Sequence, residues 1–337
     1  MGQLIKTTYL NQKDARNSGA VDNFDKLIMV TKEEDGTKKH HIIEKPMMDY
    51  YITKPEFQDN VVRNYIDKEK VRQVRCYNRD IFKSIATELK DPSVKIFYDN
   101  IMKSEDFRDR RNLKKMHLDY RIHGSDKNIE DNYIHRYLEK HAPDNNLFGL
   151  KKSFYDIEVD TQNIIGFPDQ KKAEAPINII TLVNEWNLTV ETFALKYDHD
   201  GYKDAMLDKT KLLDELKNKY KEYNLDLTFN IYEYDKEIDL ISDFFHYINE
   251  VHRPDFASAW NADFDFITIY NRILKNNAIP EELMCPDDFK YKYVYHKMDE
   301  KHNNPADKSS IYEVAGYTTY LDQMALYANI NKRATCF

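Results

Sequence analysis

Residues 150–277 hold an order of secondary-structure patterns that few folds can accommodate. Four segments rich in β-branched and aromatic residues follow one another and predict strands, in KKSFYDIEV, INIITLVN, LTVETFAL and DLTFNIYEY. An amphipathic helix with Asp235 as its N-cap comes next, then a short strand in DFASAW and a second helix in FDFITIYNRILKNN. We therefore expect a mostly antiparallel meander followed by helix, strand and helix.

The part of the chain before residue 150 has a different sequence pattern. Polar segments alternate with short apolar ones, such as KLIMV and HHIIEK, up to about residue 87, which predicts a small α+β unit, and residues 88–140 look helical. Glycine (8) and proline (10) are too scarce to mark a linker. We predict an N-terminal domain over residues 1–149 and a second domain over residues 150–337.

The charge balance limits how the chain can bind nucleic acid. Asp and Glu number 58 against 50 Lys and Arg, so the net charge is −8 and bulk attraction to a polyanion is absent. The segment EDFRDRRNLKKMHLDYR nevertheless concentrates basic residues: Arg108, Arg110, Arg111, Lys114, Lys115 and Arg121. It is either a solvated helix face or a phosphate-contacting patch. In the second case the predicted DNA-binding residues are Arg110, Arg111, Lys114 and Lys115.

Membrane and disulfide-rich classes do not suit this sequence. No apolar run approaches the roughly 18 residues that span a bilayer, and the N-terminus lacks the layout of a signal peptide. Cys76, Cys285 and Cys336 are far apart and form no Cys-x-x-Cys pair, which argues against structural zinc. We expect a cytoplasmic protein without a membrane partner.

Asp156 and Glu158 stand two residues apart in an apolar strand, so both side chains leave the same face. Such a pair can grip a divalent cation, and Asp160 continues the face as a lesser candidate. The same spacing recurs in polar contexts at Asp67/Glu69 and Asp235/Glu237. The alternative interpretation is therefore an exposed sheet face without a special role.

A second feature, N-x-x-F-D, joins the short strand to the following helix through Asn261, Phe264 and Asp265. A carboxylate at this junction can project over the pair on the neighbouring strand and complete a site for two metal ions about 4 Å apart. Asp263 is the competing acid. Alternatively, Asn261 and Asp263 cap the helix, and Asp265 only faces its dipole.

With these two motifs the chain resembles the family B DNA polymerases, most of all those of bacteriophages. The family's first exonuclease motif, D-I-E, is matched by Asp156-Ile157-Glu158, and its second by Asn261, Phe264 and Asp265, 109 residues after Asp156. The resemblance covers residues 150–275, and the element order predicted above is that of an RNase H-like nuclease. It implies an α/β protein: an α+β N-terminal domain before a 3′→5′ exonuclease core with a mixed sheet and flanking helices.

The resemblance also implies roles and partners. Asp156, Glu158 and Asp265 would hold two Mg²⁺ or Mn²⁺ ions for catalysis, while Asn261 and Phe264 would shape the pocket for the terminal nucleotide. The partners would be single-stranded or primer–template DNA, the remaining polymerase polypeptide or a C-terminal continuation, and a sliding clamp. If the source is viral, the location would be the host cytoplasm.

The family's third exonuclease motif, Y-x-x-x-D, has no convincing match. Tyr295-x-x-x-Asp299 fits the letters, but it follows Asp265 by only 34 residues, so we interpret it as chance, and Asp322 in TTYLDQMALY as structural. The polymerase motifs of the family are absent. We expect a chain without nucleotidyl transfer, cut before its third motif as an expressed fragment, a split subunit or an exon product.

Two alternatives to a weak exonuclease follow. The chain can be a catalytically silent DNA-binding and assembly fragment of a split polymerase, or a stand-alone RNase H-like nuclease. The fourth carboxylate and the tyrosine of the third motif orient the attacking water in the family. Hydrolysis by this chain alone is therefore expected to be weak or absent.

Overall fold

The computed structural model describes residues 2–22, 24–60, 67–141, 149–162, 164–196, 209–221, 223 and 225–331. The chain divides into two compact units. The first comprises Met1–Ala15, Asp22–Met29 and His41–Asn146, and the second comprises Arg16–Val21, Val30–His40 and Leu147–Phe337. Short segments from the beginning of the chain therefore belong with the second unit.

The N-terminal residues form a three-stranded sheet in the order β1 (Gln3–Leu10), β2 (Lys26–Lys32) and β3 (Lys38–Glu44), with helix α1 (Gln12–Asn17) after β1. A second three-stranded sheet has the order β5 (Val71–Tyr77), β4 (Met47–Thr53) and β6 (Ile122–His123), all antiparallel. Two short 3₁₀ segments, η1 (Pro55–Asn60) and η2 (Asn78–Asp80), precede and follow β5.

Helices fill most of residues 81–141: α2 (Ile81–Glu88), α3 (Pro92–Lys103), η3 (Phe107–Leu118) and α4 (Ile129–His141). The sequence predicts helical structure over residues 88–140, and the helices begin seven residues earlier. The apolar faces of α2, α3 and η3 share one core with β4 and β5, in which Tyr50 and Ile85 are fully buried. Within this core, η3 is a 3₁₀ helix rather than an α-helix.

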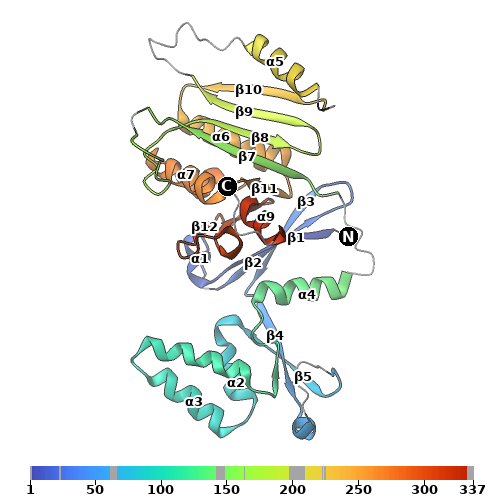
Figure 1. The fold of residues 1–337 in the computed structure, drawn as a ribbon. Coiled ribbons are helices and arrows are strands. Elements are labelled where there is room, and N and C mark those ends of the chain that lie inside the picture. The colour runs from blue at the N-terminus through green and yellow to red at the C-terminus, as the bar shows by residue number, and fades with distance from the viewer. Residues whose placement is uncertain are drawn as a thin grey trace. The chain divides into compact units, whose positions relative to one another are not determined.

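The second unit is built on a six-stranded mixed sheet in the order β10-β9-β8-β7-β11-β14 (Figure 1). Its strands are β7 (Lys152–Val159), β8 (Ile177–Asn184), β9 (Thr189–Leu195), β10 (Thr228–Tyr234), β11 (Phe256–Ala259) and β14 (Thr319–Asp322). β7, β8 and β9 form an antiparallel meander, as expected. β11 pairs parallel with both β7 and β14.

The fourth strand of the predicted, mostly antiparallel meander is the exception to that pattern. β10 pairs parallel with β9, from Thr228 opposite Thr189 to Tyr234 opposite Leu195. Helix α5 (Lys209–Lys221) lies between these strands in the sequence, and the sequence patterns did not predict it. Parallel neighbours need such a crossover because the chain must return to the starting edge before it adds the next strand.

Helices α6 (Glu237–His246) and α7 (Ala262–Lys275) lie against this sheet (Figure 1). Phe244 of α6 contacts Tyr155 of β7, with ring centroids 5.7 Å apart, and Phe266 of α7 contacts Tyr320 of β14 at 5.4 Å. The sequence predicts Asp235 as the N-cap of α6, but Lys236 takes that position, and its side chain makes no capping hydrogen bond. The remaining elements are η6 (Tyr247–His252, a π-helix), α8 (Pro280–Met284), β12 (Val294–Lys297), η7 (Pro305–Asp307), β13 (Ile311–Val314) and α9 (Gln323–Asn331).

A buried ion cluster joins the early segment of the second unit to the residues that lead into β11. The Asp255 carboxylate lies 2.7 Å from Lys32 Nζ and 2.8 Å from Lys38 Nζ, and all three side chains are buried. The Lys151 N–H also donates to this carboxylate. Burial alone would raise the pKa of Asp255, but the two ammonium groups outweigh it and hold that pKa below its ordinary value.

Across the part of the chain that the structure describes, no helix is both long and apolar enough to cross a membrane.

Candidate active site

The site lies where β11 ends beside β7. Parallel pairing aligns Ser258 with Phe154, and β11 stops at Ala259 while β7 continues to Val159. The last residues of β7 therefore extend beyond the end of β11. Helix α7 begins at Ala262, where a longer β11 would have continued, so the first turn of α7 lies beside the carboxyl end of β7.

Asp265, in the first turn of α7, occupies this gap. Its side chain is buried, with 3% of the residue exposed, and its carboxylate accepts the backbone N–H of Ile157 in β7. Burial raises the pKa of Asp265 to about 7, and the negative charge of Asp156 is the second cause of the rise. The structure therefore brings Asp265 together with Asp156, as the two sequence motifs predict.

Asp156 and Glu158 both lie on the exposed face of β7, while the alternating residues Tyr155 and Ile157 are buried. The alternation confirms that the two carboxylates share one face. Partial burial raises the pKa of Asp156. Glu158 is the last residue before an irregularity in the pairing of β7 with β8, which shifts the register between Glu158 and Val159.

These carboxylates have the chemistry of a cation site. Within the described residues, neither Asp156 nor Glu158 is found in an ion pair, so no protein cation neutralises the charge that Asp156 and Asp265 share. Carboxylate oxygens are the donors that Mg²⁺ and Mn²⁺ prefer. In the same part of the chain, no three acidic, His or Cys side chains are grouped closely enough to form a ready cation site.

Asp263, the competing acid, already has protein partners for both of its carboxylate oxygens. Lys308 Nζ lies 2.8 Å from its carboxylate, and the Tyr312 hydroxyl donates to the other carboxylate oxygen. Both partners come from the segment after β12, about 45 residues further along the chain. The sequence patterns missed them because a single Lys in a polar segment and a single Tyr on the short strand β13 carry no local signal.

Asn261 and Phe264 lie at the start of α7. The Asn261 carbonyl accepts the N–H groups of Phe264 at 2.8 Å and Asp265 at 3.1 Å, but its side chain makes no capping bond. Asn261 Oδ1 is buried and has no partner among the residues described. The ring of Phe264 packs against that of Phe167, with centroids 5.1 Å apart, and Phe167 is largely exposed.

The remaining acids that the sequence offered have local partners. Asp299 lies in the loop after β12, where its carboxylate accepts from Ser309 and His302, and Tyr295 lies on a strand rather than a helix. Asp160 accepts the N–H of Gln162 in the turn after β7. Asp322 accepts the N–H of Ala325 and thereby caps α9.

The four predicted DNA-binding cations belong to the first unit. Arg110, Arg111, Lys114 and Lys115 all lie on η3 and are exposed. Arg121, from the same basic cluster, is instead engaged with Asp119 at 2.7 Å and Asp91 at 2.9 Å.

Comparison with known families gives one match over most of the chain. Residues 58–327 match the family described as DNA polymerase family B, exonuclease domain. The comparison with curated proteins found no match. The matched range includes η3, β7, β11 and α7.

Proposed function

Because this chain belongs to the family of DNA polymerase family B exonuclease domains, we propose that it is the 3′→5′ proofreading part of a replicative polymerase. Membership implies a nuclease activity, DNA binding and a general dependence on divalent metal ions. The proposed reaction is hydrolysis of the 3′-terminal phosphodiester of single-stranded DNA, which releases a nucleoside monophosphate.

The observation that carries this proposal is the meeting of Asp265 with Asp156 at the end of β7. The charge of Asp156 raises the pKa of the buried Asp265, so it costs free energy to keep both carboxylates charged, and folding gains little from placing them together. A bound divalent cation would remove that cost. The pair therefore supports a metal-dependent reaction at this end of the sheet.

The residues divide between metal binding and substrate positioning. Asp156, Glu158 and Asp265 would hold two Mg²⁺ or Mn²⁺ ions, which supply an activated water and stabilise the leaving 3′-oxygen when bound. Asn261 presents a buried, unpartnered amide oxygen, and Phe264 presents a partly exposed ring beside Asp265. We assign these two side chains to the sugar and base of the terminal nucleotide.

A second candidate is a DNA-binding and assembly fragment that does not hydrolyse DNA by itself. It is supported by the described residues, among which no group of three acidic, His or Cys side chains is placed to hold a metal ion. It is also supported by Asp299, the one acid whose spacing fits the letters of the third motif, since its carboxylate is engaged within its own loop. This candidate shares DNA as its partner with the first.

We also infer the setting of this activity. The bacteriophage-like character of the motifs, a cytoplasmic location and a sliding clamp as partner are predictions of the sequence resemblance. The remaining polymerase polypeptide would supply nucleotidyl transfer, for which this sequence has no motif.

The test is a single-turnover nuclease assay with Mn²⁺ and an excess of the chain over a 5′-labelled single-stranded oligonucleotide. We expect slow shortening from the 3′ end, and none when the terminal linkage is a phosphorothioate. Asp265→Ala should abolish the shortening, whereas Asp299→Ala should leave it unchanged. Shortening from the 5′ end, or equal rates for the wild type and Asp265→Ala, would contradict the proposal. No cleavage by any variant would favour the second candidate.

A further inference from the structure

The first turn of α7 is held from two sides. Residues two positions apart on an α-helix point about 200° apart, so Asp263 and Asp265 leave the helix on opposite sides. Asp265 accepts the Ile157 N–H of β7, whereas Asp263 contacts the segment that contains η7 and β13. Lys308, directly after η7, places its Nζ 2.8 Å from the Asp263 carboxylate, and the Tyr312 hydroxyl of β13 donates to the other carboxylate oxygen. The two acids of this turn are therefore fixed to different parts of the unit.

The side chains of Asp263, Lys308 and Tyr312, which we call the Asp263 clamp, belong to a longer contact between α7 and β13. The Tyr312 ring packs against Phe266 with ring centroids 5.3 Å apart, and Phe266 lies one turn after Asp263 on the same face of α7. Asp263 is 4% exposed and Tyr312 is 8% exposed, so water screens this contact little. Tyr312 therefore holds two successive turns of α7, one through its hydroxyl and one through its ring.

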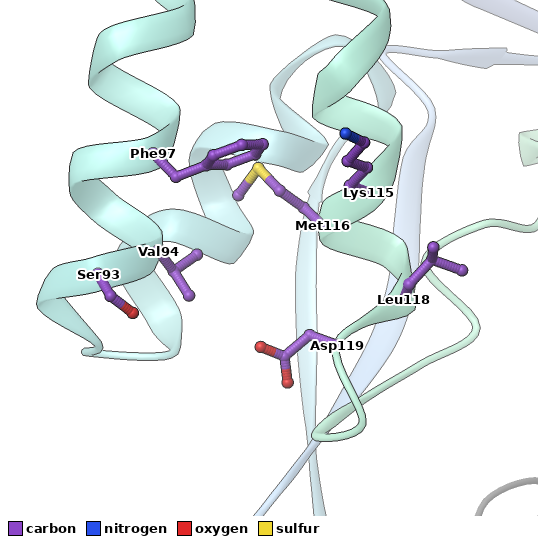
Figure 2. A pocket seen from close by; sticks show the side chains of 7 residues that line it. All are labelled: Ser93, Val94, Phe97, Lys115, Met116, Leu118 and Asp119. Carbon is purple, nitrogen blue, oxygen red and sulfur yellow. The ribbon is translucent and has the colours of Figure 1, made fainter.

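Some carboxylates of this chain are instead held by a neighbour in the sequence. Asp119 is an example, which lines a pocket of about 320 Å³ between α3 and η3 in the first unit (Figure 2). Arg121, two positions later, holds it at 2.7 Å, so this pair fixes only a short stretch of the chain. The partners of Asp263 follow it by 45 and 49 positions. The clamp therefore ties the start of α7 to an element that is distant in the sequence.

The position of Asp265 requires support of this kind. The negative charge of Asp156 acts on the buried carboxylate of Asp265 and opposes its approach to β7. The common support at the start of a helix is missing, because the Asn261 side chain makes no capping bond. A second tie on the other side of the same turn limits the rotation and the displacement of that turn.

We propose that the Asp263 clamp positions Asp265 for metal binding, so that Lys308 and Tyr312 act on the site through the first turn of α7. The clamp keeps the Asp265 carboxylate on the Ile157 N–H and thereby keeps its oxygens available to an ion at the end of β7. This inference rests on the proposed function for the identity of the site, but the placement of Asp265 can be measured without metal or substrate. The competing explanation is that the partners of Asp263 only neutralise a buried charge and stabilise the fold.

The first readout is the amide hydrogen exchange of Ile157 in EDTA, followed by NMR with ¹⁵N-isoleucine labelling. The double variant Lys308→Met and Tyr312→Phe removes both partners of Asp263 but keeps the ring on α7. In this variant the Ile157 N–H should exchange about tenfold faster, because its bond to Asp265 opens more easily. The Mn²⁺ affinity should fall by roughly 10-fold, the lower end of the cost of losing groups that orient a metal ligand. Tyr312→Phe alone should show smaller changes of the same kind, and Lys308→Arg should keep both wild-type values.

The matched control is Arg272→Met, which breaks another buried ion pair in the last turn of the same helix, where Arg272 Nε donates to Glu237 at 2.7 Å. It should destabilise the fold and leave the Ile157 exchange and the Mn²⁺ affinity unchanged. Equal effects of the control and the double variant at equal loss of stability would reduce the clamp to a stabilising contact and overturn the proposal. Unchanged Ile157 exchange in both Tyr312→Phe variants would also overturn it. A wild-type chain that neither binds Mn²⁺ nor hydrolyses DNA would refute the proposed function, while the Ile157 exchange would still decide whether the clamp positions Asp265.

Discussion

The buried carboxylate of Asp265 lies close enough to Asp156 for one negative charge to raise the pKa of the other. The two residues are far apart in the sequence and meet because β11 ends before β7 does. Asp265 also accepts the Ile157 N–H, so its position does not depend on a bound ion. The site is therefore preformed but electrostatically unfavourable.

This relationship predicts an unusual effect of Asp265→Asn on stability. The pKa of Asp265 is about 7 in the folded chain, above its ordinary value of 3.8, so its contribution to stability is complete at low pH and is lost as the pH rises toward 7. In EDTA the free energy of unfolding should lose up to about 1.4 kcal/mol per pH unit from this group in that window. At pH 8 the variant should therefore be more stable than the wild type.

Urea denaturation at pH 5, 6, 7 and 8 measures this effect. The comparison with the wild type is needed because other carboxyl groups, including Asp156, also have a raised pKa. If the difference in unfolding free energy between Asp265→Asn and the wild type stays constant across this pH range, the assignment of a buried, charged Asp265 is contradicted.

The second prediction concerns metal binding. Calorimetric titration with Mn²⁺ should show binding to the wild type that is lost in the triple variant Asp156→Ala, Glu158→Ala and Asp265→Ala. The reason is that these carboxylates are the uncompensated oxygen donors at the end of β7. Asp299→Ala serves as the control, since its carboxylate is held by Ser309 and His302. Equal binding by the wild type and the triple variant would place the metal elsewhere.

The third prediction concerns the rate of hydrolysis. The chain alone is predicted to cleave a 3′-labelled oligonucleotide slowly with Mg²⁺, because its sequence gives no convincing match to the carboxylate and tyrosine of the third motif. A nucleophile displaced by about 1 Å can cost ~100-fold in rate. A longer polypeptide that supplies Y-x-x-x-D should be at least that much faster. Asp265→Ala should inactivate both proteins. If the chain alone is as fast as the longer one, another acid must complete the site.

The fourth prediction concerns the buried ion cluster. Asp255→Asn should destabilise the fold by about 3–5 kcal/mol, because it leaves the buried ammonium groups of Lys32 and Lys38 without a counter-charge. The measurement is chemical denaturation at pH 7. Asp235→Asn is the control, since Asp235 pairs with Lys196 at 3.0 Å on the surface and its loss should change little. Similar effects of the two substitutions would show that the cluster is not a main source of stability.

Local sequence patterns predicted the features of this structure that depend on interactions between residues close together in the sequence. The alternation of buried and exposed residues in β7 follows from the period of a strand and places Asp156 and Glu158 on one face. The junction that carries Asp265 follows from an apolar strand and an amphipathic helix with few residues between them. Both motifs could therefore be located before the structure was known.

Features that depend on distant partners could not be predicted in this way. The parallel pairing of β10 depends on α5, whose polar sequence gave little signal. The occupation of Asp263 depends on Lys308 and Tyr312, which only the tertiary fold brings near. The 3₁₀ geometry of η3 is likewise invisible in a list of basic residues, although it decides which of them align.

The ion cluster at Asp255 also limits how this protein can be divided or exchanged. Lys32 precedes Asp255 by 223 positions, and residues 30–40 belong to the compact unit that contains the nuclease strands. A piece beginning at residue 147 would keep Asp255 but lose both lysines. Recombination between related genes at that boundary would therefore yield a mismatched nuclease unit unless the new partner brought equivalent cations. The second unit is thus a discontinuous module, in which residues 30–40 supply the cations that the buried carboxylate of Asp255 requires.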